Sequence, residues 1–406
     1  MAATRSDVVI VGGGPAGCWA ARCLARAGAR VALFDHSHPR EKPCGGGVTG
    51  RALALVSADV GVPALPSVAI TSAEFDDPRT IPATVSLADD TGSAASGPSL
   101  VVVDRQSFDR ALLDAACRAG AIHRDERVRA VDAGTSRVRV ETVRGTTHEA
   151  DWLIGADGAN SLVRRSLARR FSRGQLSIAA GYFAHGASSR EIKIRFVSDP
   201  AGYIWSFPRR DHLAIGICAQ GDATTAASLQ AAVAAWLEQS GIARGASLRS
   251  YGWPIPSLGA ADLAGDVFHG PRWLLVGDAA GLVDPITREG IFHALLSGQY
   301  AAEAIGAARS TDAYARQVRQ HLHPELARAA RLKRGFFRSG FTHLLVDALR
   351  RSARVRQVMA DLVAGRQPYA SLKGRLLRTF EVPLAWELMT LEWGRHGRVR
   401  RARDRP

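Results

Sequence analysis

Three aromatic residues, Tyr203, Trp205 and Phe207, have the spacing that most clearly indicates a chemical role. They alternate between two prolines in residues 200–208, whose sequence is PAGYIWSFP. Alternate side chains of a β-strand face the same side, so these three rings would form one flat wall. Such a wall suits a flat ring system or a long apolar ligand, although the same alternation also occurs in ordinary strand cores.

A glycine-rich loop near the start of the chain has the spacing of a phosphate-binding turn. The loop consists of Gly12, Gly13, Gly14, Pro15, Ala16 and Gly17. It matches G-x-G-x-x-G directly after a predicted strand and at the start of a predicted helix. Gly12 permits the tight turn, Gly14 lets the backbone approach a pyrophosphate, and Gly17 lets the helix pack closely on the strand. The N-terminus of that helix, where Pro15 and Ala16 lie, favours the negative charge of phosphates.

Three aspartates that follow predicted strands extend this site. Asp35 ends the second strand, where a carboxylate can bind a ribose hydroxyl. Asp157 and Asp278 follow two later strands, within the sequences IGADG and LVGDAAG. The carboxylate of Asp278 can accept a hydrogen bond from a ribityl chain, which FAD has and NAD lacks. The joint presence of these segments in this order favours FAD as the cofactor, with Gly277 beside Asp278 as a further contact.

A β-α-β unit and a second sheet are needed to position these residues. Predicted strands at residues 7–11 and 30–35 flank a helix at 15–27. Further strands are predicted at residues 100–103, 127–131, 137–143, 148–154, 178–184, 191–197, 203–208, 213–218 and 272–277. Further helices are predicted at residues 107–119, 225–240 and 289–307, the first of them capped by Ser107.

The predicted fold class is therefore α/β, with three parts. They are a Rossmann-like FAD-binding domain, an antiparallel sheet-rich substrate domain and a helical C-terminal region. The FAD-binding domain is expected to be discontinuous, because its predicted strands are separated by the sheet-rich stretch. We assign residues 1–60, 99–165 and 268–310 to the FAD-binding domain, 61–98 and 166–267 to the substrate domain, and 311–406 to the basic helical region.

Composition limits the class of protein further. The chain has 406 residues, of which 46% are hydrophobic, and no apolar run is long enough to span a membrane. The first strand begins by Asp7, which leaves no room for a secretory signal. Its five cysteines are odd in number and scattered, which indicates a reducing cytoplasm without disulfides, and we expect no metal site.

Positive charge is concentrated at the C-terminal end. The net charge is +15, and residues 331–406 contain 18 Lys and Arg against six Asp and Glu. Such a region can attract an anionic membrane surface or an acidic partner protein, or it can reflect an arginine-rich composition alone. No nucleic-acid reader motif accompanies the charge, so no nucleic acid is expected. Helices containing Phe336, Phe337, Phe341, Leu344 and Leu345 would either lie peripherally on the inner face of the membrane or pack on the FAD domain.

Five motifs together resemble the geranylgeranyl reductase family, within the FAD enzymes built like p-hydroxybenzoate hydroxylase. The resemblance covers nearly the whole chain, and the aromatic motif at residues 200–208 is its most specific element. The other motifs are KPCGGG at 42–47, VDR at 103–105 with Phe108 and Asp109, GDAAGLVDPIT at 277–287, and GRQPY at 365–369. One departure is Arg288, which stands where the family usually has a glycine beside the flavin ring.

The resemblance implies reduction of isolated C=C bonds in a long-chain isoprenoid, with a hydride from reduced flavin N5. Cys44 would contact the cofactor and either donate a proton to the alkene or shape the pocket. Gly45, Arg105, Gly290 and Ile291 are the further cofactor contacts that it implies. The aromatic wall would bind the prenyl chain, each buried CH₂ group contributing about 0.8 kcal/mol.

The electron donor and the rival activities stay open at the level of sequence. A second G-x-G-x-x-G motif is missing, so NAD(P)H would bind transiently, and a reduced ferredoxin or another electron-donor protein is an equal alternative. The main rival is a flavin-dependent monooxygenase or halogenase, since halogenases have a related G-W-x-W-x-I-P motif. An electron-transfer module is disfavoured because no cysteine follows Cys218 to bind an iron–sulfur cluster. A non-catalytic FAD-binding protein associated with a membrane is the third alternative.

Overall fold

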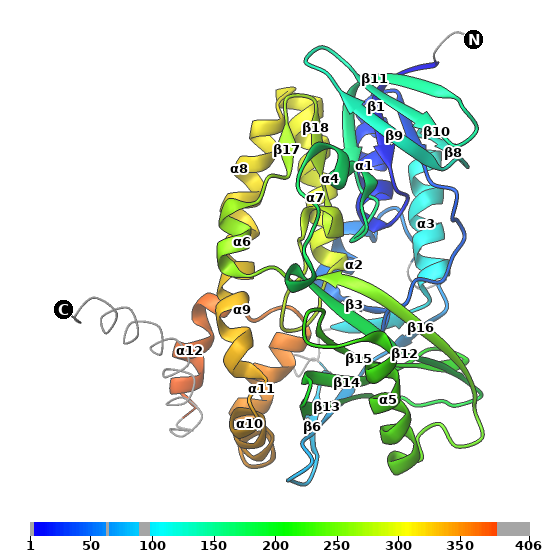
Figure 1. Cartoon of the computed structure of the whole chain (residues 1–406). Helices are drawn as coiled ribbons and strands as arrows, with labels where there is room; N and C mark the ends of the chain where they lie inside the picture. Colours follow the sequence, from blue (N-terminus) through cyan, green and yellow to red (C-terminus); the bar gives the residue numbers. More distant parts are fainter. Residues whose placement is uncertain (1–3, 62–64, 89–97, 380–406) are drawn as a thin grey trace, which may run out of the picture.

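The first large sheet of the computed structural model, which describes residues 4–61, 65–88 and 98–379, contains the Rossmann-type unit. β1 (Thr4–Val11), α1 (Pro15–Arg26) and β2 (Val31–Phe34) form a parallel β-α-β unit. The strand order is β17 (His269–Gly270), β18 (Trp273–Leu275), β11 (Thr147–Gly155), β1, β2 and β8 (Ile122–Arg124). The ends of β1, β11 and β18 therefore lie side by side at one edge, where the loops that follow them meet (Figure 1).

An antiparallel ribbon extends from this sheet. β9 (Val128–Ala133) pairs with β10 (Val138–Thr142), which pairs with β11. α1 packs between α3 (Arg105–Arg118) and α7 (Ile291–Glu303) on one face of the sheet. The predicted ribbon is confirmed, and β11 also joins the parallel sheet beside β1.

The second large sheet has seven strands and is mainly antiparallel. Its order is β16 (Ser247–Pro256), β12 (Leu176–His185), β15 (His212–Gln220), β14 (Ala201–Pro208), β13 (Ile192–Ser198), β5 (Ser72–Asp76) and β6 (Ala83–Ser86). α5 (Ala226–Ser240) covers β12 and β15 on one face. A small third sheet contains β3 (Gly47–Thr49), β7 (Leu100–Val103) and β4 (Ser67–Ala69).

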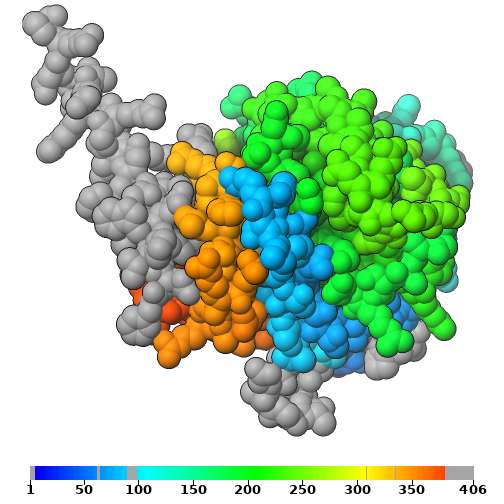
Figure 2. Space-filling view, turned by 90° about the horizontal axis from the view of Figure 1, so that it is seen from below, coloured from blue at the N-terminus to red at the C-terminus, as the bar shows by residue number. Residues whose placement is uncertain are grey.

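The C-terminal helices pack on both large sheets. α8 (Thr311–His321) contributes Tyr314 and Val318 to the core beneath the Rossmann-type sheet. The helices α9 (His323–Phe336), α10 (Ser339–Arg351), α11 (Ala353–Val363) and α12 (Tyr369–Leu377) share a core with β5, β6 and β13. Figure 2 shows the orange C-terminal helices against the blue segment that contains β5 and β6.

The apolar residues predicted for a membrane-facing surface are not on the surface. Phe336, Phe337, Phe341 and Leu345 are buried, and Leu344 is half-buried. Their rings and side chains fill the core beside the second sheet instead, because that sheet presents the apolar face of β5, β6 and β13 to them. The same core includes Leu100, Val102 and Ile286, which lie in the ranges assigned to the FAD-binding domain, so these residues pack on part of that domain as well. Residues 380–406, which carry part of the predicted basic region, lie outside the described residues.

Two helix boundaries differ from the prediction. α3 begins at Arg105 after an N-cap at Asp104, so Ser107 lies within its first turn. The Glu41 carboxylate, 64 residues earlier in sequence, accepts hydrogen bonds from the Arg105 and Gln106 N–H groups, and no local pattern could reveal this cap. α7 begins at Ile291 and ends at Glu303, where a π-helical turn, η4 (Ala304–Ala308), follows.

Short helices complete the chain and the fold class is confirmed. These are α2 (Gly50–Val56), α4 (Leu162–Leu167), α6 (Ala260–Gly265), and the 3₁₀ turns η2 (Arg173–Gln175) and η3 (Gly277–Ala280). The architecture is mixed α/β, with a parallel Rossmann-type sheet, an antiparallel-rich sheet and C-terminal helices. Among the described helices, none has both the length and the apolarity needed to cross a bilayer. The domain boundaries stay a prediction.

Candidate active site

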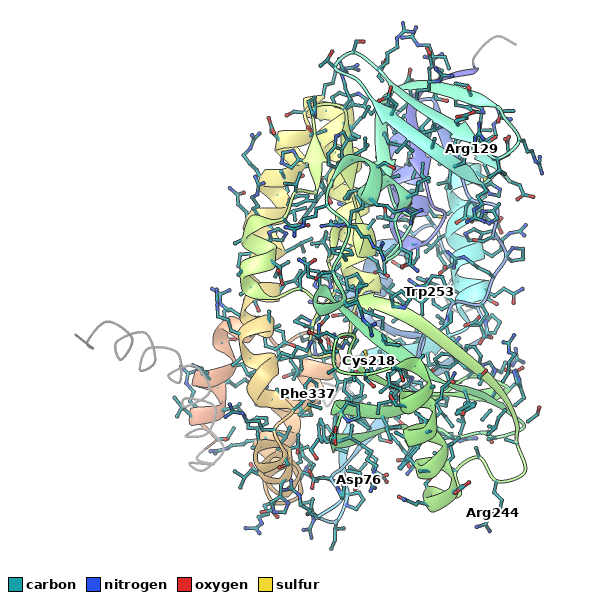
Figure 3. All side chains as sticks on the ribbon, in the orientation of Figure 1. Asp76, Arg129, Cys218, Arg244, Trp253 and Phe337 are labelled. Carbon is teal, nitrogen blue, oxygen red and sulfur yellow. The ribbon has the colours of Figure 1, made fainter. Side chains whose placement is uncertain are left out.

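A cavity of about 250 Å³ lies where the two large sheets meet the C-terminal helices. Its walls come from residues 42–47, the aromatic face of β14, the 283–291 loop, and α9 and α11. Figure 3 places Cys218 and Phe337, which both line it, in this central region, far from Arg129 and Arg244 at the ends of the molecule. The lining thus joins segments that are far apart in sequence.

The cavity lining contains ten of the residues that the sequence predicts for the site. They are Pro15, Cys44, Gly45, Arg105, Tyr203, Trp205, Phe207, Asp278, Gly290 and Ile291. The predicted residues outside the lining belong to the segments that follow β1, β2, β11 and β18, including the first turn of α1. These are Gly12, Gly14, Ala16, Gly17, Asp35, Asp157 and Gly277.

The aromatic wall stands on β14. Trp205 is 6% exposed, and its ring centroid lies 6.0 Å from that of Tyr203. Tyr203 stacks on Phe337 at 6.0 Å and donates a hydrogen bond from its hydroxyl to the Thr287 carbonyl at 3.1 Å. The Phe207 ring occupies the space in which a side chain at Gly45 would lie, with 2.5 Å to the ideal Cβ position. The wall therefore contacts two loops of the cavity directly.

The glycine loop has the geometry of a pyrophosphate cradle. Gly12 has φ 104°, and a Cβ at this position would lie 2.4 Å from the Ala156 carbonyl oxygen. A Cβ on Gly17 would lie 1.9 Å from the Gly12 carbonyl oxygen, so only glycine fits there. Gly14 faces open space and has no side chain to cap the α1 N–H groups. These open N–H groups fit the phosphates of a dinucleotide.

Asp35 is held in a defined position at the end of β2. Its carboxylate accepts hydrogen bonds from the Gly13 N–H and the Ser37 N–H, both at 2.7 Å, and from the Ser37 hydroxyl. Burial alone would raise the pKa of Asp35, and these hydrogen bonds lower it below its usual value. A charged carboxylate fixed beside the glycine loop fits a ribose hydroxyl donor.

Asp157 has a structural role that its sequence motif did not reveal. Its carboxylate accepts hydrogen bonds from the Ser161 hydroxyl at 2.5 Å and from the Leu162 and Val163 N–H groups at 2.6 and 3.2 Å. Burial raises the pKa of Asp157 despite these bonds. Asp157 thus holds the start of α4, and its backbone packs against Gly12.

Asp278 lies in the cavity beside the start of α7. Lys42 donates to its carboxylate at 3.0 Å, across 236 positions of sequence. Gly290 approaches Asp278 closely, since a Cβ there would lie 3.5 Å from the carboxylate oxygen. Gly277 has φ 56° and donates its N–H to the Ser297 hydroxyl at 3.0 Å, which fixes the turn before Asp278. The Asp278 carboxylate, a hydrogen-bond acceptor, and the N-terminus of α7 therefore lie at the same part of the cavity.

Cys44 and Arg105 lie together in the lining. Cys44 accepts a hydrogen bond from the Gly46 N–H at 3.3 Å. Arg105 forms a buried bidentate ion pair with Asp109, at 2.9 and 2.8 Å. Burial would lower the pKa of Arg105, and Asp109 and Cys44 raise it above its ordinary value. A fixed cation near the sulfur stabilises negative charge there.

Arg209 holds the loop that carries Cys44, and sequence analysis missed it. Its side chain is 2% exposed and donates to the carbonyl oxygens of Gly45 at 3.2 Å, Cys44 at 3.0 Å and Val103. It also pairs with two carboxylates, those of Asp104 at 3.0 Å and Glu41 at 3.2 Å. Arg209 directly follows the aromatic motif, and this position in the sequence could have identified it as a site residue.

Tyr369, from the C-terminal GRQPY segment, also belongs to the site region. Its hydroxyl donates to the Asp284 carboxylate at 3.1 Å, and Asp284 accepts the Ile286 and Thr287 N–H groups. Burial first, and then Asp284, raise the pKa of Tyr369 well above its usual value. The segment therefore fixes the loop that carries Thr287, which gives a physical reason for its presence in the family pattern.

The fold and site together define an FAD-dependent oxidoreductase. Residues 5–308 match the FAD binding domain family. The geranylgeranyl diphosphate reductase of Rhodobacter capsulatus is 33% identical over 322 residues, 74% of this chain and 75% of that protein. The digeranylgeranylglycerophospholipid reductase of Methanothrix thermoacetophila is 29% identical over 82% of this chain and 88% of its own length. The menaquinone reductase of Mycolicibacterium smegmatis is 30% identical over 76% of this chain and 78% of its own.

The chain belongs to the geranylgeranyl reductase family. A geranylgeranyl bacteriochlorophyll reductase-like protein from Thermoplasma acidophilum has the same fold, with a TM-score of 0.78 and 22% identity over 93% of this chain and 100% of that one. A flavin-dependent brominase is also similar in fold, with a TM-score of 0.68 and 20% identity over 92% of this chain and 99% of that one. The cofactor is FAD, and the glycine loop geometry fits it.

Proposed function

We propose that the protein reduces C=C bonds in the prenyl chain of a lipid, quinone or pigment precursor. The observation that carries this proposal is one cavity that joins the cofactor loops to a long apolar wall. Beyond Tyr203, Trp205 and Phe207, that wall includes Phe75, Ile192, Ile194, Phe196, Phe336, Phe337, Met359, Leu362 and Val363. The relatives named for geranylgeranyl and menaquinone substrates support it.

Each part of the site then has a task. FAD, when bound, supplies a hydride from reduced N5. The glycine loop holds the phosphates, Asp35 a ribose and Asp278 the ribityl chain, while Gly277, Gly290 and Ile291 shape the flavin side of the cavity. Cys44 donates a proton to the second alkene carbon or shapes its surroundings, and an unactivated alkene requires this close positioning.

Replacement of a tryptophan tests the apolar wall. Trp205→Ala removes ring surface from the cavity, and we expect it to weaken binding of a prenyl substrate far more than binding of FAD. Trp236→Ala is the matched control, because Trp236 is similarly buried at 8% exposure but lies on α5 and packs in another core. Calorimetric titration of both ligands gives the result. Equal loss of both affinities in Trp205→Ala would remove Trp205 from the substrate wall.

Monooxygenation or halogenation is the second candidate, and it rests on likeness of fold. The brominase shares the fold at 20% identity, and β14 carries Tyr203 and Phe207 where the halogenase motif has tryptophan and isoleucine. We favour reduction because the three relatives described above, at 29–33% identity, are named reductases. An assay without oxygen separates the two, since a monooxygenase or halogenase has no turnover there.

For the electron donor we propose transient NAD(P)H or a reduced ferredoxin. Neither is favoured by a specific contact, and both deliver electrons to a flavin that stays bound. Anaerobic mixing of the holoenzyme with NADH, NADPH or reduced ferredoxin, followed by flavin absorbance, identifies the donor. The donor is the one that bleaches the flavin fastest at equal concentration.

We propose peripheral contact with an anionic membrane surface on the basis of positive charge alone. Exposed arginines at the two ends of α10, Arg338 before its start and Arg350 and Arg351 in its last turn, would supply it, because the neighbouring phenylalanines are buried. Liposome sedimentation with and without anionic lipid tests this contact. Sedimentation that does not depend on anionic lipid would end the proposal.

A further inference from the structure

One charged residue of the cavity lining has no opposite charge beside it in the described part of the chain. The charged lining residues are Lys42, Arg105, Asp278, Arg288 and Glu289. Lys42 pairs with Asp278, Arg105 with Asp109, and Glu289 with Arg51. Among described residues Arg288 has no carboxylate within ion-pair distance, and its Nε is buried without a hydrogen-bond partner.

Arg288 is also held in a backbone conformation that disfavours it. Its φ is 62°, in the left-handed region, which glycine adopts readily and arginine does not. The family usually has a glycine at this position. Arg288 lines the cavity, and its Nη1 donates to the hydroxyl of Ser257, which lies just outside the lining, at 2.8 Å.

A second cation binds the same hydroxyl. Lys333 donates from Nζ to Ser257 at 2.7 Å, and among the described residues it has no ion-pair partner either. It lies one helical turn before Phe336 and Phe337, which line the cavity. Burial first, and then Arg288, lower the pKa of Lys333 to about 7, while Cys218 and the exposed Asp222 act in the opposite direction.

We propose that Arg288, supported by Lys333 on Ser257, forms an oxyanion subsite for the phosphate-bearing end of the isoprenoid substrate. The inference rests on the proposed function and narrows its substrate class from prenyl lipids, quinones or pigment precursors in general to prenyl phosphates. Two cations that converge without a carboxylate are unfavourable until an anion joins them. Arginine binds phosphate oxygens through paired N–H groups, and Arg288 has a buried Nε without a partner.

The phosphate could be a free diphosphate or the phosphate of a glycerophospholipid. Both present the same oxyanion chemistry to Arg288. The experiment therefore compares geranylgeranyl diphosphate, digeranylgeranylglycerophosphate in detergent micelles, and uncharged geranylgeraniol. Inorganic pyrophosphate serves as a probe that lacks the apolar chain.

The variants are Arg288→Gly, which suits the backbone conformation, and Lys333→Gln. Arg331→Gln is the control, because Arg331 is an exposed cation on the same helix outside the cavity lining. We expect Arg288→Gly to weaken binding of the phosphate-bearing ligand by roughly 10- to 100-fold, and Lys333→Gln less, with geranylgeraniol binding within about two-fold. Arg331→Gln should leave all affinities unchanged. The phosphate ligand whose affinity falls most identifies the source of the phosphate.

Three outcomes have distinct meanings. Equal weakening of geranylgeraniol and the phosphate-bearing ligands would overturn the subsite. An altered flavin reduction potential in Arg288→Gly, with unchanged ligand affinities, would also overturn it and assign Arg288 to the cofactor. Pyrophosphate binding that depends on both cations, in an enzyme that reduces none of the isoprenoids, would support the subsite and contradict the proposed function.

Discussion

We propose Cys44 as the proton donor of the reaction because of the residues that surround it. It lies in the cavity lining with Arg105, whose charge is fixed by the buried ion pair to Asp109. A proton donor becomes negatively charged when it acts, and a nearby cation stabilises that charge. Gly45, beside it, cannot carry a side chain because Phe207 fills the space. The thiol is therefore placed between the aromatic wall and the cofactor loops.

Cys44→Ala tests this role. If the thiol donates the proton, the rate of substrate reduction in a single turnover should fall by roughly 10²- to 10⁴-fold, with FAD affinity nearly unchanged. Cys218→Ala is the matched control, because Cys218 lines the same cavity from β15. A rate for Cys44→Ala equal to that of the control would leave Cys44 with a packing role only.

The loop of residues 41–47 is the element on which the geometry of the site most depends. It has little regular structure. Its position is set by Arg209, which follows β14, and by the hydrogen bond that the Glu41 carboxylate of the loop accepts from the start of α3. One guanidinium thus ties the cofactor loop, β7 and the aromatic strand together. A buried group with this many acceptors cannot be removed without leaving carboxylates and carbonyls unpaired.

Arg209→Gln should therefore loosen the loop. We expect the free energy of unfolding to fall by roughly 3–5 kcal/mol, because a buried guanidinium is lost and two half-buried carboxylates and three carbonyl oxygens lose their partner, and FAD affinity to fall with it. Arg210→Gln, at the adjacent exposed position, should change stability by no more than about 0.5 kcal/mol. Urea unfolding and FAD titration measure both. Comparable stabilities of the two variants would contradict the assigned role of Arg209.

The elements that sequence predicts well are those fixed by local chemistry. The glycine loop, β1 and α1 follow from backbone requirements at Gly12 and Gly17, and the alternation at Tyr203, Trp205 and Phe207 follows from strand geometry. Long-range partners were not predictable. The Glu41 cap of α3 and the five contacts of Arg209 depend on distances that only the folded chain defines.

At the scale of the whole molecule, the cavity has a cofactor end and an apolar end. The cofactor end belongs to loops after the Rossmann-type strands, and the apolar end is closed by α9 and α11. The sequence left open whether the C-terminal helices lie on a membrane or pack on the FAD domain. In the structure Phe336 and Phe337 are buried and line the cavity. The amphipathic pattern of a helix predicts that one of its faces is buried, but it does not predict which element that face packs against.

Met359→Trp tests whether the apolar end holds the far part of the chain. Met359 lies on α11 in the cavity lining, and a larger side chain there shortens the space available. We expect roughly ten-fold or more weaker binding of a geranylgeranyl substrate and little change for a geranyl substrate. Met359→Leu preserves the volume and should bind both normally. An equal effect on the two chain lengths would mean that the prenyl chain does not reach α11.

The most direct test of the account is a single turnover without oxygen. The FAD-loaded protein is photoreduced, mixed with geranylgeranyl diphosphate, digeranylgeranylglycerophosphate or geranylgeraniol, and followed by flavin absorbance and product mass. The account predicts that the flavin is reoxidised and that a product gains two hydrogen atoms per reduced double bond. A flavin that stays reduced with every isoprenoid until oxygen is admitted, and then yields an oxygenated or halogenated product, would contradict it.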